Sequence, residues 1–202
     1  MISAIILAAG ASSRMGQPKA ALPFGQTGET VLSRIVSTIL AGGVTSVAVV
    51  AGAHLDAARQ AMPRHERRAR VIEHLGWEQG QLSSLVAGLD AIDEPSLEAV
   101  MVTPVDVPLV TPATVAALIS AWRRTRAPIV RPVDGERHGH PVIFDRSVFD
   151  ELRSANPNLG AKAVFATHRD RVLNVEVKDP GAFEDIDTPG DYQRLFGKPL
   201  GT

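Results

Sequence analysis

The chain of 202 residues contains no cysteine. Its absence excludes a disulfide framework, thiol catalysis and zinc held by cysteine thiolates. An excess of charge of either sign is also missing, since 21 Lys and Arg residues nearly balance 22 Asp and Glu residues. That balance gives no bulk attraction to nucleic acid or to a membrane surface. We therefore expect neither as a partner, and any bound anion must be held by locally placed cations.

No stretch of the sequence is apolar for long enough to span a bilayer. The apolar run over residues 2–8 lies at the short limit for a targeting segment, and no Lys or Arg precedes it. We expect this run to be a buried strand, and we expect a cytoplasmic location.

Strand-like and helix-like segments alternate along the chain, which predicts an α/β fold with a mostly parallel sheet. The absence of repeats, low-complexity segments and linker-like composition predicts a single domain over residues 1–202. The expected strands are residues 2–8, 44–51, 69–73, 99–103, 129–131, 142–144 and 172–177. The expected helices are residues 30–41, 54–62, 81–92, 111–124, 147–154, 159–166 and a last helix that begins at Thr188.

A loop of mostly small residues, 9–19, follows the first expected strand. With little side-chain bulk, its backbone N–H groups can approach a polyphosphate. Arg14 and Lys19 can add fixed positive charge. The loop lacks both the Gly-Lys-Ser/Thr ending of a P-loop and the G-x-G-x-x-G of a dinucleotide site. It is therefore either a third kind of phosphate loop or merely a long connection.

Asp106 is a candidate for a ligand site. It follows the expected strand 99–103, at the carboxyl end where open α/β sheets bind ligands, although it could also simply turn the chain before Pro108. A second acidic segment holds Asp185 and Asp187, which share a face if the segment is extended. On its local pattern alone, this segment is good chemistry for the start of the last expected helix.

The motif Leu7-Ala8-Ala9-Gly10-x-Ser12-x-Arg14-Met15-Gly16-x-x-Lys19 resembles the signature of the MobA-like nucleotidyltransferases. That family includes the enzymes that attach GMP or CMP to molybdopterin. The resemblance implies a nucleotide-diphospho-sugar transferase (Rossmann-like) fold, with three α/β/α layers and an antiparallel strand in the mostly parallel sheet. It implies nucleotide contacts from the loop at Leu7, Ala8, Ala9, Gly10, Ser12, Arg14, Gly16 and Lys19.

The two acidic segments extend the resemblance. Asp106 lies in a segment similar to the family's Asp-x-Pro motif, whose Asp holds the catalytic Mg²⁺. Asp187 lies in a segment similar to the closing Asp-Ile-Asp-Thr-Pro-x-Asp motif, which implies a second metal ligand. Arg14, Lys19 and Asp106 are then the catalytic set, because nucleotidyl transfer depends mainly on positioning and on cations that offset phosphate charge. A phosphate monoester acceptor is already anionic and needs no general base.

Residues 77–89 resemble the family's Gly-x-x-x-Ser-Leu-x-x-Gly-Leu stretch, which implies nucleotide contacts from Gly80 and Ser84. A Ser at a helix start can equally satisfy the backbone. Trp77 could stack on a ring, or it could belong to the core.

Two further segments resemble the acceptor side of the cytidylyl branch and imply acceptor contacts from His140, Pro141, Gly160 and Lys162. Asn158 stands where that branch has Asp, and Lys162 stands where it has Arg. Lys keeps the charge but loses bidentate geometry. A metal site at His138 and His140 would need further ligands.

These features predict a Mg²⁺-dependent nucleotidyltransferase that moves NMP from an NTP to a phosphorylated acceptor, with CTP and molybdopterin as the expected pair. The guanylyl branch tends to have Gly-Gly where this chain has Ala9-Gly10, which favours CTP. The alternatives are a molybdopterin guanylyltransferase, a sugar- or polyol-phosphate nucleotidyltransferase, and a nucleotide-binding maturation factor without turnover. A molybdoenzyme or its chaperone is a further candidate partner.

Overall fold

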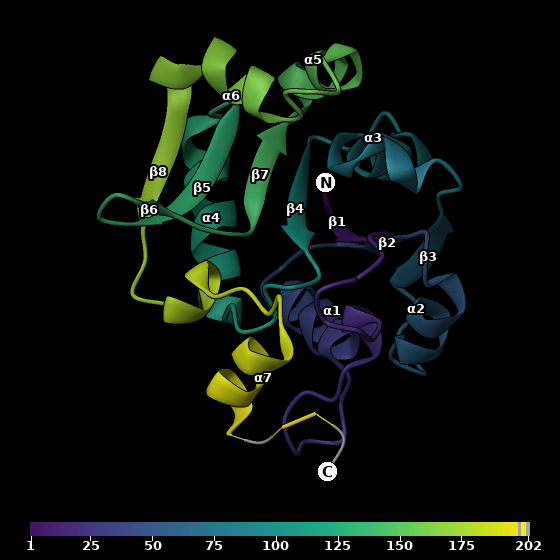
Figure 1. Ribbon diagram of the computed structural model, residues 1–202. Coiled ribbons are helices and arrows are strands. Elements are labelled where there is room, and N and C mark those ends of the chain that lie inside the picture. The colour runs from purple at the N-terminus through teal and green to yellow at the C-terminus, as the bar shows by residue number, and fades with distance from the viewer. Residues whose placement is uncertain (198, 201–202) are drawn as a thin grey trace.

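A mixed eight-stranded sheet forms the centre of the computed structural model, which describes residues 1–197, 199 and 200 (Figure 1). Residues 198, 201 and 202 of the predicted domain lie outside the described residues. The strand order is β3-β2-β1-β4-β7-β5-β6, with β8 paired to β5. The strands are β1 (Ile2–Ala8), β2 (Val47–Ala51), β3 (Ala69–Glu73), β4 (Ala99–Pro104), β5 (Ile129–Asp134), β6 (Arg137–His138), β7 (Val142–Asp145) and β8 (Val172–Glu176).

The strand directions confirm the predicted sheet. β1 to β4 are mutually parallel, and β8 is parallel to β5. β7 runs antiparallel to both of its neighbours, β4 and β5, and the two-residue β6 runs antiparallel to β5. The sheet therefore has a parallel part, β3-β2-β1-β4, joined through an antiparallel strand to a second part.

Helices cover both faces of the sheet, which confirms the predicted three layers (Figure 1). One buried cluster joins the sheet to α1, α2 and α4, and a second joins it to α3, α5 and α6. The helices are α1 (Val31–Ala41), α2 (Leu55–Ala61), α3 (Gln81–Ile92), α4 (Pro112–Thr125), α5 (Phe149–Ser154), α6 (Lys162–Thr167) and α7 (Pro189–Phe196). No helix among the described residues is long and apolar enough to cross a membrane.

β1 is apolar except for the buried Ser3, because both of its faces are covered. Ile2, Ala4 and Ile6 belong to the cluster under α1, whereas Ile5 belongs to the cluster under α3. A strand covered on both sides does not show the alternation of apolar and polar residues found in half-exposed strands. This is why an uninterrupted run of seven residues forms the strand that leads into the loop 9–19.

Some predicted boundaries were wrong by a few residues. The second strand begins at Val47, not at residue 44, because Thr45 turns there and donates through its backbone N and its Oγ1 to the carbonyl of Ile2. The helix predicted over 159–166 begins at Lys162, after a turn in which Gly160 has a φ of +63°. The helix predicted over 54–62 is Leu55–Ala61.

Candidate active site

Three segments that are distant in the sequence meet at the carboxyl ends of β1 and β4. Leu7 is paired with Pro104, and the N–H of Val105 donates to the carbonyl of Leu7 at 3.0 Å. The N–H of Ile186 then donates to the carbonyl of Asp106 at 2.8 Å. Residues after β1, after β4 and before α7 therefore face one crevice.

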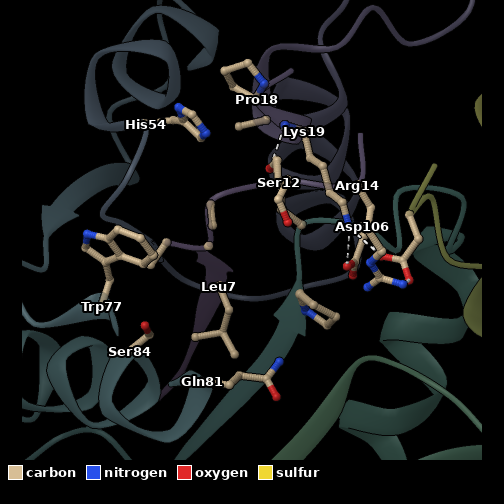
Figure 2. A pocket seen from close by; sticks show the side chains of 18 of the residues that line it. Leu7, Ser12, Arg14, Pro18, Lys19, His54, Trp77, Gln81, Ser84 and Asp106 are labelled. Atoms are coloured by element: carbon tan, nitrogen blue, oxygen red, sulfur yellow. Dashed lines mark hydrogen bonds and ion pairs between the residues drawn. The ribbon is translucent and has the colours of Figure 1, made fainter. Parts of the chain in front are cut away.

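A cavity of about 380 Å³ lies in this crevice, and we call it the loop cavity (Figure 2). The predicted nucleotide and metal residues line it, with the exception of Gly16. Those that line it are Leu7, Ala8, Ala9, Gly10, Ser12, Arg14, Lys19, Gly80, Ser84, Asp106 and Asp187. The structure thus brings the residues of three separate motifs to one place.

Gly16 shapes the loop without lining the cavity. The carbonyl of Ser12 accepts hydrogen bonds from the N–H groups of Met15 and Gly16 at 3.0 and 3.1 Å. This tight turn requires a positive φ at Ser12 (+51°) and at Gly16 (+73°), a conformation that glycine adopts without strain. The buried side chain of Met15 fixes the turn to the core. Gly16 therefore supports the loop that its neighbours form, and the nucleotide contact expected of Gly16 itself stays a prediction.

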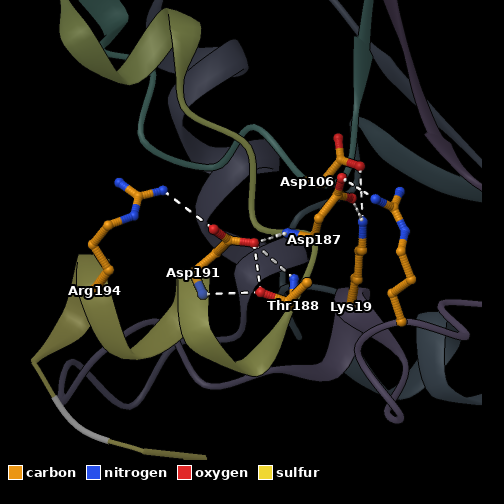
Figure 3. A network of polar contacts seen from close by, with 7 residues as sticks. Lys19, Asp106, Asp187, Thr188, Asp191 and Arg194 are labelled. Atoms are coloured by element: carbon orange, nitrogen blue, oxygen red, sulfur yellow. Dashed lines mark hydrogen bonds and ion pairs between the residues drawn. The ribbon is translucent and has the colours of Figure 1, made fainter.

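Lys19 lies between the two predicted metal-binding carboxylates (Figure 3). Its Nζ is 2.9 Å from Asp106 Oδ2 and 2.6 Å from Asp187 Oδ1. Nη1 of Arg14 is 2.9 Å from Asp187 Oδ2. The Lys19 side chain is only 12% exposed, whereas that of Arg14 is 70% exposed. The Lys19 side chain is therefore held in place, whereas the Arg14 side chain has room to move toward a bound ligand.

Burial disfavours the charge on Lys19, but the hydrogen bonds and charges of Asp187 and Asp106 outweigh it and raise the pKa of Lys19. The hydrogen bond from Lys19 is the main reason that the pKa of Asp187 is lowered. Both groups are therefore ionised across the neutral range.

The two carboxylates suit a divalent cation because they already converge on a single positive charge. Mg²⁺ prefers oxygen ligands and usually takes one or two carboxylates together with phosphate oxygens. Asp106 and Asp187 would hold it. Asp187 is positioned by α7, where Asp191 Oδ2 accepts from the N–H of Thr188 at 2.9 Å and from the N–H of Asp187 at 3.3 Å (Figure 3). Asp191 is thus a capping residue of α7.

The opposite wall of the loop cavity comes from the start of α3. Gly80, with a φ of +98°, is the N-cap of α3. The buried Ser84 and the half-buried Trp77 both face the loop cavity (Figure 2).

Sequence reasoning missed His54 and Gln81, which also line the loop cavity. Nε2 of His54 lies 2.9 Å from the carbonyl of Ala11 and so supports the loop. The only local signal for either residue was its place at an expected helix start.

A second cavity, of about 450 Å³, lies between α3, β7 and α6, and we call it the apolar cavity. His140, Gly160 and Lys162, three of the four predicted acceptor residues, line it together with Asn158, whereas Pro141 does not. Pro141 is buried directly before β7, and the acceptor contact expected of it stays a prediction. Most of the remaining wall is hydrocarbon, from Leu7, Leu82, Leu85, Val102, Val142, Phe144, Pro157, Leu159, Ala161 and Phe165.

A third cavity, of about 320 Å³, is polar, and we call it the acidic cavity. It shares Asp106 with the loop cavity and His140 with the apolar cavity, and Asp185 and His138 line it as well. Burial and the neighbouring charges of Asp106 and Asp187 raise the pKa of Asp185. Burial lowers the pKa of His140, against the charge of Asp106. In the described part of the chain, no group of three or more His, Asp or Glu side chains is placed to hold a metal ion, so His138 and His140 gain no further ligands.

Comparison with known proteins gives the family. The model of the MobA-like NTP transferase domain matches residues 4–172. The chain belongs to the MobA-like NTP transferase family. It is therefore a member of the nucleotidyltransferase superfamily of enzymes, and the resemblance drawn from the loop motif is confirmed at that level.

Among individual relatives, nicotine blue oxidoreductase of Paenarthrobacter nicotinovorans is 29% identical over 204 residues, covering 96% of each chain. A probable molybdenum cofactor guanylyltransferase of Mycobacterium avium is 34% identical over 137 residues, covering 68% of this chain and 66% of its own. The molybdenum cofactor cytidylyltransferase of Escherichia coli is 27% identical over 198 residues, covering 95% and 93%. The names of these relatives describe different activities, so the comparison does not identify one substrate for this chain.

The solved structure of Rv0371c from Mycobacterium tuberculosis matches with a TM-score of 0.82 and 29% identity, covering 98% of this chain and 99% of its own. The same protein has also been solved in complex with manganese, with a TM-score of 0.73 to this chain and coverage of 98% of both. A divalent metal is thus plausible for the family.

Proposed function

We propose that this chain transfers a nucleoside monophosphate from an NTP to a phosphorylated acceptor and releases pyrophosphate. The observation that carries the proposal is the convergence of Lys19 and Arg14 with Asp106 and Asp187 in a cavity lined by the loop 9–19. Cations that face the triphosphate and carboxylates that face a metal form a charge-matched site for this reaction.

In this mechanism, the backbone of the loop and Ser12 bind the phosphates, and Lys19 and Arg14 offset the charge that develops on the leaving pyrophosphate. Asp106 and Asp187 would hold Mg²⁺, which when bound supplies further positive charge at the phosphates. The acceptor oxygen forms a bond to the α-phosphorus as the bond to pyrophosphate breaks. With a phosphate acceptor no proton has to be removed, so no base is needed.

We favour CTP as the donor because of Ala9. Ala9 is only 4% exposed and belongs to the same buried cluster as Leu82 and Leu85 of α3, and it lines the loop cavity together with Trp77 and Ser84. A methyl group there leaves less room than Gly for a purine.

We favour molybdopterin as the acceptor, and propose that residues 1–202 act as one domain. The E. coli cytidylyltransferase, which aligns over most of the chain, supports this reading.

The test is a panel of four NTPs with Mg²⁺, each paired with molybdopterin and with sugar and polyol phosphates, and scored for pyrophosphate release. We expect turnover with CTP and molybdopterin. Absence of turnover with every pair would refute the transferase proposal. Turnover with GTP but not CTP would refute the choice of nucleotide only.

A second candidate is the reduction of an aromatic compound. It is favoured by the alignment with nicotine blue oxidoreductase over 96% of both chains and by the hydrocarbon wall of the apolar cavity. An assay with NADH or NADPH in place of the NTP, and with an oxidised aromatic compound such as a quinone in place of the phosphorylated acceptor, distinguishes the two. Only a reductase oxidises the dihydronicotinamide, so only a reductase lowers its absorbance.

A further inference from the structure

The loop cavity, the apolar cavity and the acidic cavity meet at one side chain. The loop and apolar cavities share Leu7 and Gln81, the loop and acidic cavities share Pro104, Asp106 and Gln81, and the apolar and acidic cavities share His140 and Gln81. Gln81 is therefore the residue common to all three. Figure 2 shows its side chain beside Leu7, on the far side of the cavity from the loop that ends in Lys19.

This position has a chemical meaning if one cavity holds the nucleotide and another holds the acceptor. Transfer requires the attacking oxygen and the α-phosphorus to lie within about 3–3.5 Å of each other before the bond forms. That meeting point must lie where the two cavities join. The inference rests on the proposed function, since it takes the loop cavity as the NTP site and the neighbouring cavities as the acceptor site.

The Gln81 amide is free to serve there. It makes no hydrogen bond to any residue that the structure describes, and the residue is exposed. It is the first residue of α3, whose N-cap Gly80 provides no side-chain cap and whose first turn has no acidic residue. The partial positive charge of the helix start favours an anion beside Gln81, and the nearest acidic residue in the chain, Glu78, lies outside the helix, before its N-cap.

We propose that Gln81 contacts the reacting phosphates at the point of transfer. Its side-chain N–H donates to a phosphoryl oxygen while the acceptor oxygen bonds to the α-phosphorus and the bond to pyrophosphate breaks. An uncharged donor suits a place where two anions approach each other, because it stabilises both without binding either so tightly that the product is retained.

The test compares Gln81→Ala, Gln81→Glu and the control Gln79→Glu, in the NTP and acceptor panel described above. Gln79 lies two residues earlier and lines none of the three cavities. We expect Gln81→Ala to lower kcat by about 10-fold, less than the roughly 10²–10³-fold that removal of a preorganised donor costs, because the Gln81 side chain is exposed and no hydrogen bond from a described residue holds it. The dissociation constant of the NTP, measured without acceptor, should change less than twofold.

The Glu variant separates a role in the reaction from a role in the fold. A carboxylate in the first turn of a helix favours the fold, so the melting temperature should stay the same or rise. The same carboxylate repels both phosphates, so kcat should fall further than in Gln81→Ala. Gln79→Glu should keep wild-type turnover.

Several results would overturn the proposal. Gln81 variants within twofold of wild-type kcat, or Gln81→Glu more active than Gln81→Ala, would remove Gln81 from the transfer point. A loss that appears wholly as weaker NTP binding would make it a nucleotide-binding residue only. If the wild-type chain releases no pyrophosphate with any acceptor, the proposed function fails and this inference fails with it.

Discussion

The two halves of the sheet support cavities of opposite character. On the parallel side, the loop cavity carries two cations, Arg14 and Lys19, and three carboxylates, of which Asp106 and Asp187 are paired with the cations and Glu78 lies at the start of the opposite wall. On the side of the antiparallel β7, the apolar cavity carries mainly hydrocarbon, with Lys162 as the one charged side chain in its described lining. Under the proposed function, the charged cavity binds the triphosphate, whereas the hydrocarbon wall and the shape of the apolar cavity select the acceptor.

The largest effect should follow from removing charge on the polar side. Asp106→Asn should lower the rate of pyrophosphate release by about 10³-fold, because it removes the proposed metal ligand and the partner of Lys19. Thermal unfolding should show that the fold is kept. Asp150→Asn is the matched control, since the Asp150 side chain is 99% exposed and lines none of the three cavities. An Asp106→Asn variant that keeps more than a tenth of the activity would contradict the metal assignment.

Lys19 should compete with the metal for the same two carboxylates. Lys19→Met should therefore tighten Mn²⁺ binding to the nucleotide-free chain by about 10-fold, since a charge pair near a protein surface is worth up to about 4 kcal/mol. Electron paramagnetic resonance of free and bound Mn²⁺ measures this affinity directly. Arg14→Met, which removes a mostly exposed cation, should have less effect. Weaker Mn²⁺ binding by Lys19→Met would argue against competition.

A charge placed in the apolar cavity should affect the acceptor and not the nucleotide. Leu159 lines that cavity and is 58% exposed, whereas Leu75 is 85% exposed and lines none of the three cavities. Leu159→Asp should raise the KM for the acceptor by about 10-fold, since a carboxylate loses hydration there. Leu75→Asp should leave it unchanged. Equal changes of the acceptor KM in both variants, or a change in NTP affinity, would show that the two cavities do not bind the acceptor and the nucleotide separately.

A smaller change on the polar side should shift the choice of base. Ala9→Gly should raise the ratio of kcat/KM for GTP to that for CTP by about 10-fold, the low end of what one methyl group contributes in a pocket. Steady-state kinetics with each nucleotide give the ratio. An unchanged ratio would mean that the base is selected elsewhere on the wall of α3.

The smallest effect concerns the pH dependence of stability at His140. Burial holds the pKa of His140 below its ordinary 6.5, so its stabilising contribution is complete above that value and is lost as the pH falls through the lower folded pKa. Its Nδ1 is buried with no hydrogen-bond partner among the described residues. His140→Gln should therefore lose less stability than wild type between pH 7.5 and 5 in urea unfolding. The exposed His65→Gln should behave as wild type does.

The sequence predicted the parallel half better than the other half for a physical reason. The loop 9–19 and Asp106 follow their strands directly, and parallel neighbours such as β1 and β4 must end at the same edge. Asp187 was not fixed by such local signals, because its position depends on the long-range pairing of Ile186 with Asp106. Only the family resemblance pointed to it.

Other features depended on packing that no local pattern reports. Gly16 matched the motif but shapes the turn at Ser12 instead of lining the cavity. In the sequence, Gln81 is only the first residue of an expected helix. Its position between the three cavities depends on how β7 and α6 close the neighbouring cavities. The apolar cavity could not be predicted from the hydrophobic periodicity of any one segment either, because residues from α3, β4, β7 and α6 form it together.

The last helix, α7, sets a practical limit on how this protein can be trimmed. The segment that matches the family model ends at residue 172, before Asp187. Yet the hydroxyl of Tyr192 donates to the carbonyl of Pro23 at 3.0 Å, and Phe196 packs edge-on against Phe24, so α7 clasps the stretch that follows the first loop. A clone cut at the family boundary would lose one of the two carboxylates together with this clasp. Truncations and fusion junctions belong beyond Phe196.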